Sequence, residues 1–302
     1  MKGDAKQGLK ELNEGLKYDP NNWEIYQLLG TGYAWNVNDL DFVKAIENLH
    51  KAVNINHDKE LPTLLRSLGN IYNGFAGFPE KAEYYYKEAF KLDGDSISYL
   101  LRLGDVEWNL GNFSGALEFF NKAYAIDSNN IDIIRGIGEQ YMFLDQLKES
   151  LKYFRKCVKK YEASGQLDLA YLHRYGYVYW QNGLKKEAEY FFNEQKKYCE
   201  ESIKLKRYTA TVLLTAYYDL AGVHAFLGEK EKAYENLRIL GEIPIFPRWW
   251  LTLIKNDPLF DGMRNETGFQ IIVNDLEAKY QAEHERVGKW IEEQEILQQS
   301  KN

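Results

Sequence analysis

The sequence predicts an all-α protein, an α-α superhelix of consecutive helical hairpins that is closed by C-terminal capping helices. Three features of the 302 residues support this prediction. A small residue preceded by an apolar one recurs at spacings of 39, 35, 34, 38 and 45 residues. A second pattern of small and aromatic residues follows each occurrence. Proline, which interrupts helices, is scarce at 6 residues. Repeats of this length indicate a stack of similar helix pairs.

The first pattern marks the first helix of each expected hairpin. Its small residue lets the partner helix approach closely, and in most copies a tyrosine three residues later fills the space beside it. The copies are Leu29-Gly30, Leu68-Gly69, Leu103-Gly104, Ile137-Gly138, Tyr175-Gly176 and Leu220-Ala221.

The second pattern marks the second helix of each hairpin. A small residue is followed four positions later by an aromatic residue or leucine, and in most copies by another small residue three positions beyond. The copies are Ala45-Leu49-Ala52, Ala82-Tyr86-Ala89, Ala116-Phe120-Ala123, Ser150-Phe154-Cys157, Ala188-Phe192 and Ala233-Leu237. These small residues allow close packing toward the next hairpin.

Together the two patterns resemble the tetratricopeptide repeat, which has a period of about 34 residues. The resemblance implies a right-handed superhelix whose first helices line a concave groove, and a function in protein binding. We expect a half repeat and six hairpins forming a solenoid over residues 1–243, followed by a cap over 244–302. The expected half repeat covers 1–20, and the hairpins cover 22–57, 60–94, 96–129, 130–164, 167–200 and 206–242.

The irregular parts of the repeat have local explanations. Residues 1–20 correspond to a second helix whose first helix is absent, so we expect more sequence upstream in the natural protein. The longer spacings predict insertions between helices at 36–41, 161–167 and 199–209. Gly111, Gly183 and Gly228 lie where a chain leaving a helix needs a left-handed residue.

The composition changes after Glu242, where prolines and two adjacent tryptophans appear. The stretch Asp257-Pro258-Leu259-Phe260-Asp261, with Arg264, resembles a segment that closes the tetratricopeptide region of bacterial multidomain regulators. That group includes winged-helix regulators and adenylate cyclases with TolB-like regions. The resemblance implies an effector domain N-terminal to the repeats.

Apolar residues at helical spacing from Phe269 to Ile291 predict one amphipathic helix of about 30 residues. The simpler interpretation is a cap that covers the apolar face of the last hairpin. The alternative is that its far half, which carries Val287 and Trp290, pairs with a second chain and forms a homodimer.

Charge and hydropathy exclude several classes of partner. The net charge is −7, with both signs interspersed and no basic stripe, so we expect no nucleic-acid partner. No apolar run reaches the roughly 18 residues of a membrane span, so we expect no direct membrane insertion. Met1 is followed by polar residues rather than a signal core, which favours the cytoplasm. A periplasmic location stays open if an upstream signal or membrane segment was removed.

The chain carries no local signature of catalysis. The five histidines form no HExxH motif, and Cys157 and Cys199 lie in helical patterns that cannot assemble a four-ligand metal site. The glycine-containing segment 74–77 is expected in an inter-helix turn rather than in a phosphate-binding loop. We therefore expect no enzyme activity, no metal and no cofactor.

Counting along each repeat from its small residue locates the side chains that face the expected groove. Aromatic, arginine and asparagine side chains there are suited to holding a peptide, although each can instead pack between helices. The candidates are Trp35, Arg66, Asn70, Arg102, Trp108, Arg135, Phe143, Tyr177, Trp180 and Tyr218. The same count places Asp105 and Glu139 on this face.

The carboxylate clamp of chaperone-binding tetratricopeptide proteins is not expected, because Arg102, Asp132 and Gly136 replace residues that the clamp needs. Two functions remain open. The first is a scaffold that binds a peptide or partner domain in the groove. The second is the sensory or regulatory arm of a larger bacterial signalling or transcription-regulating protein.

Overall fold

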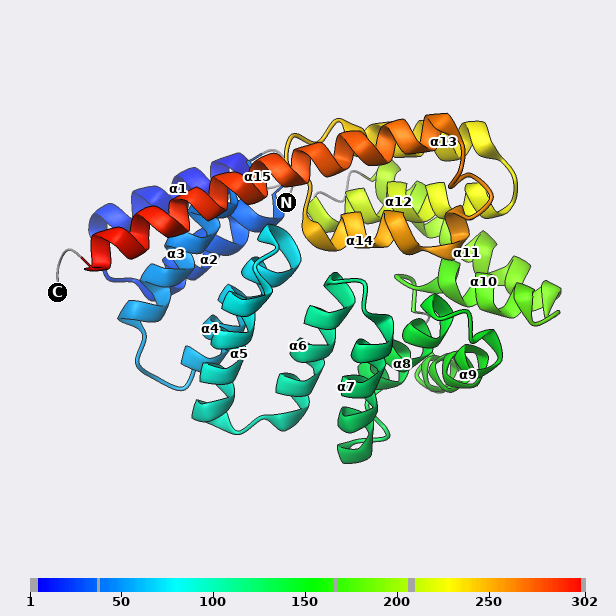
Figure 1. The fold of residues 1–302 in the computed structure, drawn as a ribbon, viewed down its shortest axis with the longest axis horizontal. Helices are drawn as coiled ribbons and strands as arrows, with labels where there is room; N and C mark the ends of the chain where they lie inside the picture. Colours follow the sequence, from blue (N-terminus) through cyan, green and yellow to red (C-terminus); the bar gives the residue numbers. More distant parts are fainter. Residues whose placement is uncertain (1–4, 37–38, 166–167, 206–209, 300–302) are drawn as a thin grey trace. The chain divides into compact units, whose positions relative to one another are not determined.

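The computed structural model describes residues 5–36, 39–165, 168–205 and 210–299. Within these ranges every regular element is a helix, and consecutive helices run antiparallel as hairpins (Figure 1). The all-α prediction is confirmed. The chain divides into two compact units, each described by itself. Unit 1 comprises residues 1–95, 243–251 and 274–302, and unit 2 comprises 96–242 and 252–273.

Unit 1 contains α1 (Ala5–Tyr18), α2 (Trp23–Trp35), α3 (Phe42–Ile55), α4 (Leu61–Asn70), the π-helix η1 (Ile71–Ala76) and α5 (Pro79–Asp93). Unit 2 contains α6 (Ser96–Asn109), α7 (Phe113–Ile126), α8 (Ile131–Phe143), α9 (Leu147–Ala163), α10 (Leu172–Gln181), α11 (Lys185–Lys204), α12 (Ala210–Phe226), α13 (Lys230–Gly241) and the 3-10 helix η2 (Pro258–Phe260). Helices α14 (Arg248–Asn256) and α15 (Thr267–Gln299) contribute residues to both units. The expected hairpin bounds and the domain boundary at 243 stay predictions.

The small residues of the two sequence patterns bring paired helices into contact. In unit 2 a Cβ atom on Gly138 would lie 2.6 Å from the ring of Phe154, and one on Gly176 would lie 2.6 Å from Phe192. Only glycine leaves room for these rings, because real Cβ contacts are longer. Phe154 is completely buried. The expected close approach within hairpins is therefore confirmed.

The turns between paired helices use left-handed glycines as expected. Gly111, Gly183 and Gly228 have φ angles of 80°, 81° and 79°. After Gly111, the side chain of Asn112 accepts a hydrogen bond from the N–H of Gly115 at 3.1 Å and so caps the start of α7. The chain thus ends one helix and begins the next within three residues.

Two local expectations are wrong. The insertions at 161–167 and 199–209 were expected between helices, but α9 continues to Ala163 and α11 to Lys204, because both segments keep a helical pattern. Parts of the expected insertions at 36–41, 161–167 and 199–209 lie outside the described residues. The segment 74–77 is not a simple turn either, since the π-helix η1 extends α4 to Ala76 and only Gly77, at φ 80°, leaves the helix.

Within unit 1 the far half of α15 packs against helices more than 200 residues earlier in the sequence. Glu283 accepts the N–H of Phe42 at 3.2 Å, and the Trp290 indole donates to Glu47 at 3.0 Å. Val287 is completely buried. The apolar face of this half of α15 is therefore covered by helices of the same chain, and not by the last hairpin. It needs no second chain to cover it, so the reason for expecting a homodimer there does not hold.

The segment around Asp257 forms a compact corner within unit 2. The Arg264 guanidinium donates to the carbonyl oxygen of Asp257 at 2.7 Å and to the Asp261 carboxylate at 2.9 Å. The Asp257 carboxylate, which is completely buried, accepts the N–H of Leu259 at 3.0 Å. These bonds satisfy backbone groups at the end of α14 and the start of η2. The residues of this motif thus have structural roles.

Candidate functional site

A cavity of about 350 Å³ opens on the surface formed by the first helices α6 and α8 and the residue that precedes α10, all in unit 2. We call this the first-helix cavity. Its lining residues are Leu101, Arg102, Asp105, Phe120, Asp132, Arg135, Gly136, Glu139 and Tyr171.

The ring of Phe120 sets the spacing of the two first helices. A Cβ atom on Gly136 of α8 would lie 2.5 Å from this ring, and one on Gly104 of α6 would lie 3.1 Å from it. The ring from the second helix α7 therefore lies against both first helices. This packing, which follows from the repeat pattern, brings groove residues of α6 and α8 to one cavity.

The two arginines of the cavity are both bonded to carboxylates. Arg102 donates to Asp105 at 2.8 Å, and Arg135 donates to Asp132 at 2.5 Å. Arg135 also lies 4.2 Å above the ring of Tyr171, a cation–π contact that fixes its guanidinium in place. These positive charges are therefore largely neutralised by their own side-chain partners.

A buried ion-pair network begins at the cavity wall. Glu139 is bonded to the guanidinium of Arg174, whose Nε lies 3.9 Å from the Asp257 carboxylate. Asp257 also accepts a hydrogen bond from the Tyr218 hydroxyl at 2.8 Å. Arg174 is 7% exposed, so this network holds three elements of unit 2 together in a setting where unpaired charge is strongly unfavourable.

A second buried polar cluster joins α10, α11 and α12. The Gln195 side chain accepts the backbone N–H of His173 at 3.1 Å and donates to Asp219 at 3.1 Å. Burial lowers the pKa of His173 well below its usual value and raises the pKa of Asp219 well above its usual value. Burial therefore disfavours the charged form of both side chains. The His173 Nε2 lies 3.6 Å from the Asp219 carboxyl group and has no hydrogen-bond partner among the described residues.

The Asp219→Asn variant is expected to raise the free energy of unfolding near pH 8 by about 1 to 3 kcal/mol. Because the folded-state pKa of Asp219 is raised, the stability of the wild type falls as pH rises from the unfolded-state pKa toward the folded-state pKa. Asparagine does not ionise, and it can accept from Gln195 and donate to His173. Urea denaturation at about pH 5 and about pH 8 measures the difference. If the free energy of unfolding gained by Asp219→Asn over wild type does not increase with pH, the pKa of Asp219 is not raised in the folded state.

The aromatic groove candidates of unit 2 form two groups. Trp108 lies edge-to-face with Phe143 at 6.1 Å, and both are partly exposed. Trp180 lies edge-to-face with Phe226 at 6.0 Å. Tyr177 and Tyr218 are buried, and burial raises the pKa of Tyr177 to about 12. The structure thus gives Tyr177 and Tyr218 packing contacts, and their expected ligand contacts stay predictions.

The candidates of unit 1 are engaged in contacts of their own. Trp35, which is 37% exposed, packs edge-to-face on Phe75 at 4.6 Å. Arg66 is bonded to Asp93. Asn70 accepts the Tyr86 hydroxyl at 2.9 Å. No cavity that we describe includes these three residues, so their expected ligand contacts also stay predictions.

Sequence counting placed Arg102, Asp105, Arg135 and Glu139 on one face, and the structure brings all four to the first-helix cavity. Sequence counting did not identify Tyr171, which also lines this cavity. This residue precedes α10, next to an expected insertion where the repeat count has no fixed register. A tyrosine near a helix start carries no signal of its own.

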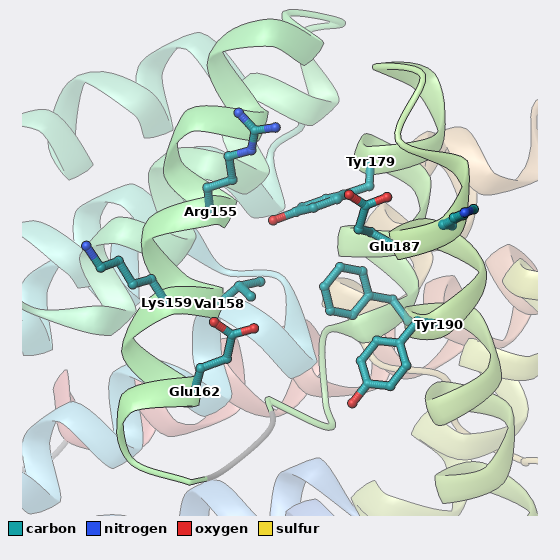
Figure 2. Close-up of a pocket in the computed structure, with 9 residues that line it drawn as sticks. Arg155, Val158, Lys159, Glu162, Tyr179, Glu187 and Tyr190 are labelled. Atoms are coloured by element: carbon teal, nitrogen blue, oxygen red, sulfur yellow. The ribbon is translucent and has the colours of Figure 1, made fainter.

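A second cavity, of about 770 Å³, lies among α9, α10 and α11. Figure 2 shows Arg155 on α9 beside Tyr179 from α10, whereas the Lys159 side chain points away from Tyr179 and from Tyr190 of α11. Charges of both signs line this second-helix cavity, including Glu187. This second-helix cavity serves as the control location when ligand binding at the first-helix cavity is tested.

Among the described residues, no three histidine, cysteine or acidic side chains are grouped so that they could hold a metal ion. In the same part of the chain, no helix combines the length and apolar character that crossing a membrane requires.

Residues 74–131 match the family model of the tetratricopeptide repeat. The chain is 23% identical over 277 residues to the TPR repeat-containing protein MJ1428 of Methanocaldococcus jannaschii, a match that covers 89% of this chain and 46% of that protein. The chain thus spans about half the length of this relative. Tetratricopeptide repeats generally mediate protein–protein interactions.

Solved structures include similar folds. The Rap conjugation gene regulator of plasmid pLS20, in complex with the Phr* peptide, has a TM-score of 0.62 and is 15% identical, with 88% of this chain and 75% of that one covered. MamA is 27% identical over 54% of this chain and 92% of that one, with a TM-score of 0.40. The first likeness supports the tetratricopeptide-type fold. The resemblance of the segment around Asp257 to bacterial multidomain regulators stays a prediction.

Proposed function

We propose that this protein is a binding scaffold that holds a peptide segment of a partner on the surface formed by α6, α8 and α10. The observation that carries the proposal is the first-helix cavity, in which the predicted groove residues Arg102 and Arg135 meet from successive repeats. A cavity with charged side chains and an apolar wall can fix both the position and the orientation of a peptide. The Rap regulator, similar in fold, is described in complex with a peptide, which supports the same use of the fold.

The proposal is tested by selecting peptides from a random library displayed on phage against the full chain. We expect the selected peptides to lose at least about tenfold in affinity for Leu101→Trp, which fills the cavity. Leu110→Trp is the matched control, because Leu110 is 54% exposed beyond the end of α6. Thermal unfolding followed by circular dichroism verifies that both variants fold. Selection of no peptide, or equal binding to Leu101→Trp and wild type, would contradict the proposal.

A regulatory role is the second candidate, because the similar Rap structure is described as a conjugation gene regulator. In that case the peptide changes another part of the chain, and the Glu139–Arg174–Asp257 network gives it a path from the cavity wall to η2. Hydrogen exchange of residues 252–273 with and without a selected peptide tests this role. Unchanged exchange would argue for a passive scaffold.

A further inference from the structure

The charged groups of the first-helix cavity differ in how much of their bonding capacity is already used. Both guanidinium groups that line it have carboxylate partners, at 2.8 Å for Arg102 and 2.5 Å for Arg135. A third guanidinium behind the wall, that of Arg174, is bonded to Glu139. Within the described part of the chain, the Nε of Arg102 has no hydrogen-bond partner but is buried, so an incoming carboxylate would compete with the carboxylates already bonded to these arginines.

The two aspartates are the most exposed charged groups of the cavity. The side chain of Asp105 is 40% exposed and that of Asp132 is 62% exposed, compared with 35% for Arg102, 16% for Arg135 and 15% for Glu139. Asp105 is bonded to Arg102 through Oδ2, and a carboxylate accepts several hydrogen bonds. Three carboxylates and two guanidinium groups line the cavity, so its lining carries one excess negative charge, which Arg174 behind the wall partly offsets through its bond to Glu139.

The acid–base properties agree with this excess. Enclosure by the cavity walls raises the pKa of Asp105, and although Arg102 opposes the rise, Glu139 adds to it. Burial alone would lower the pKa of Arg135, but Tyr171 and the surrounding carboxylates raise it above the usual value. A further positive charge would stabilise the ionised form of Asp105.

The apolar part of the lining suits the stem of a long side chain. Leu101 projects from α6 beside Phe120, whose ring lies between α6 and α8. Lysine and arginine cover apolar surface with their methylene groups while the charged end reaches polar partners. We infer that the first-helix cavity receives a lysine or arginine side chain of the bound peptide, with the charged end beside Asp105 and Glu139 and the stem against Leu101. This inference rests on the proposed function and specifies its ligand.

The test repeats the peptide selection with wild type, Asp105→Asn and Glu118→Gln. Glu118 is an exposed acid on α7 outside the cavity, so its variant makes the same change of charge in the same unit. We expect peptides selected on wild type and Glu118→Gln to share a basic residue at one position. Replacing that residue by methionine should lower affinity for wild type about tenfold and affinity for Asp105→Asn much less.

The outcomes separate the inference from the function on which it rests. Two results would overturn the inference and leave the proposed function standing. In the first, the selected peptides lose affinity for Leu101→Trp but share no basic residue. In the second, they require a carboxylate for binding. A basic residue that contributes equally in wild type and Asp105→Asn would also overturn it. If Leu101→Trp does not affect the binding of any peptide, both fail.

Discussion

Replacing Arg174 by methionine is expected to lower the free energy of unfolding by about 3 to 5 kcal/mol. Methionine fills the volume of the aliphatic stem but leaves Glu139 and the completely buried Asp257 without their cationic partner. Uncompensated buried carboxylates are among the most destabilising features a fold can contain. Urea denaturation followed by circular dichroism measures the loss.

Two further variants make this result specific. Arg238→Met, on the exposed side of α13, should change the free energy of unfolding by no more than about 0.5 kcal/mol. Adding Glu139→Gln to Arg174→Met should recover part of the loss, because it removes one of the unpaired charges. A loss below about 1 kcal/mol for Arg174→Met would show that the network does not hold unit 2 together.

Replacing Phe154 by alanine is expected to lower the free energy of unfolding by about 3 to 5 kcal/mol. Its completely buried ring packs on the backbone of Gly138 and lies 4.7 Å from the ring of Tyr175. Loss of the ring therefore leaves a cavity between two neighbouring hairpins. Tyr190→Ala, at a tyrosine that is 49% exposed, is the control and should lose less than about 1 kcal/mol.

The contact between Gly138 and Phe154 can be separated from general burial by a double-mutant cycle. Gly138→Ala alone should destabilise the protein by about 1 to 3 kcal/mol, because the added methyl group would overlap the Phe154 ring. In the Phe154→Ala background the same change should have little effect. Equal effects in the two backgrounds would mean that this ring does not set the helix spacing.

The sequence predicts those parts of the fold that depend on neighbouring segments. The glycine opposite Phe154 and the left-handed glycines at Gly111 and Gly183 act within one hairpin, so their spacing alone reveals the packing. The far half of α15 is different, because its contacts with Phe42 and Glu47 bridge more than 200 residues. An amphipathic pattern shows that a helix has an apolar face, but it does not show which partner covers that face.

The candidate site divides in the same way. Repeat counting places Arg102, Asp105 and Arg135 on one face because first helices are in register. Whether a side chain on that face is exposed or buried depends on the neighbouring elements. Tyr218 is buried, and it contacts Asp257 and Phe260, which come from a segment without the repeat pattern.

The central claim is that ligand binds at the first-helix cavity, and site-specific photo-crosslinking tests it most directly. A benzophenone-bearing residue replaces one position at a time in a peptide selected on the wild-type chain, and each peptide is illuminated with the wild-type protein. We predict that the peptide becomes attached to residues that line the first-helix cavity and not to residues that line the second-helix cavity. Attachment to the second-helix cavity alone would contradict the claim and place the ligand among α9, α10 and α11.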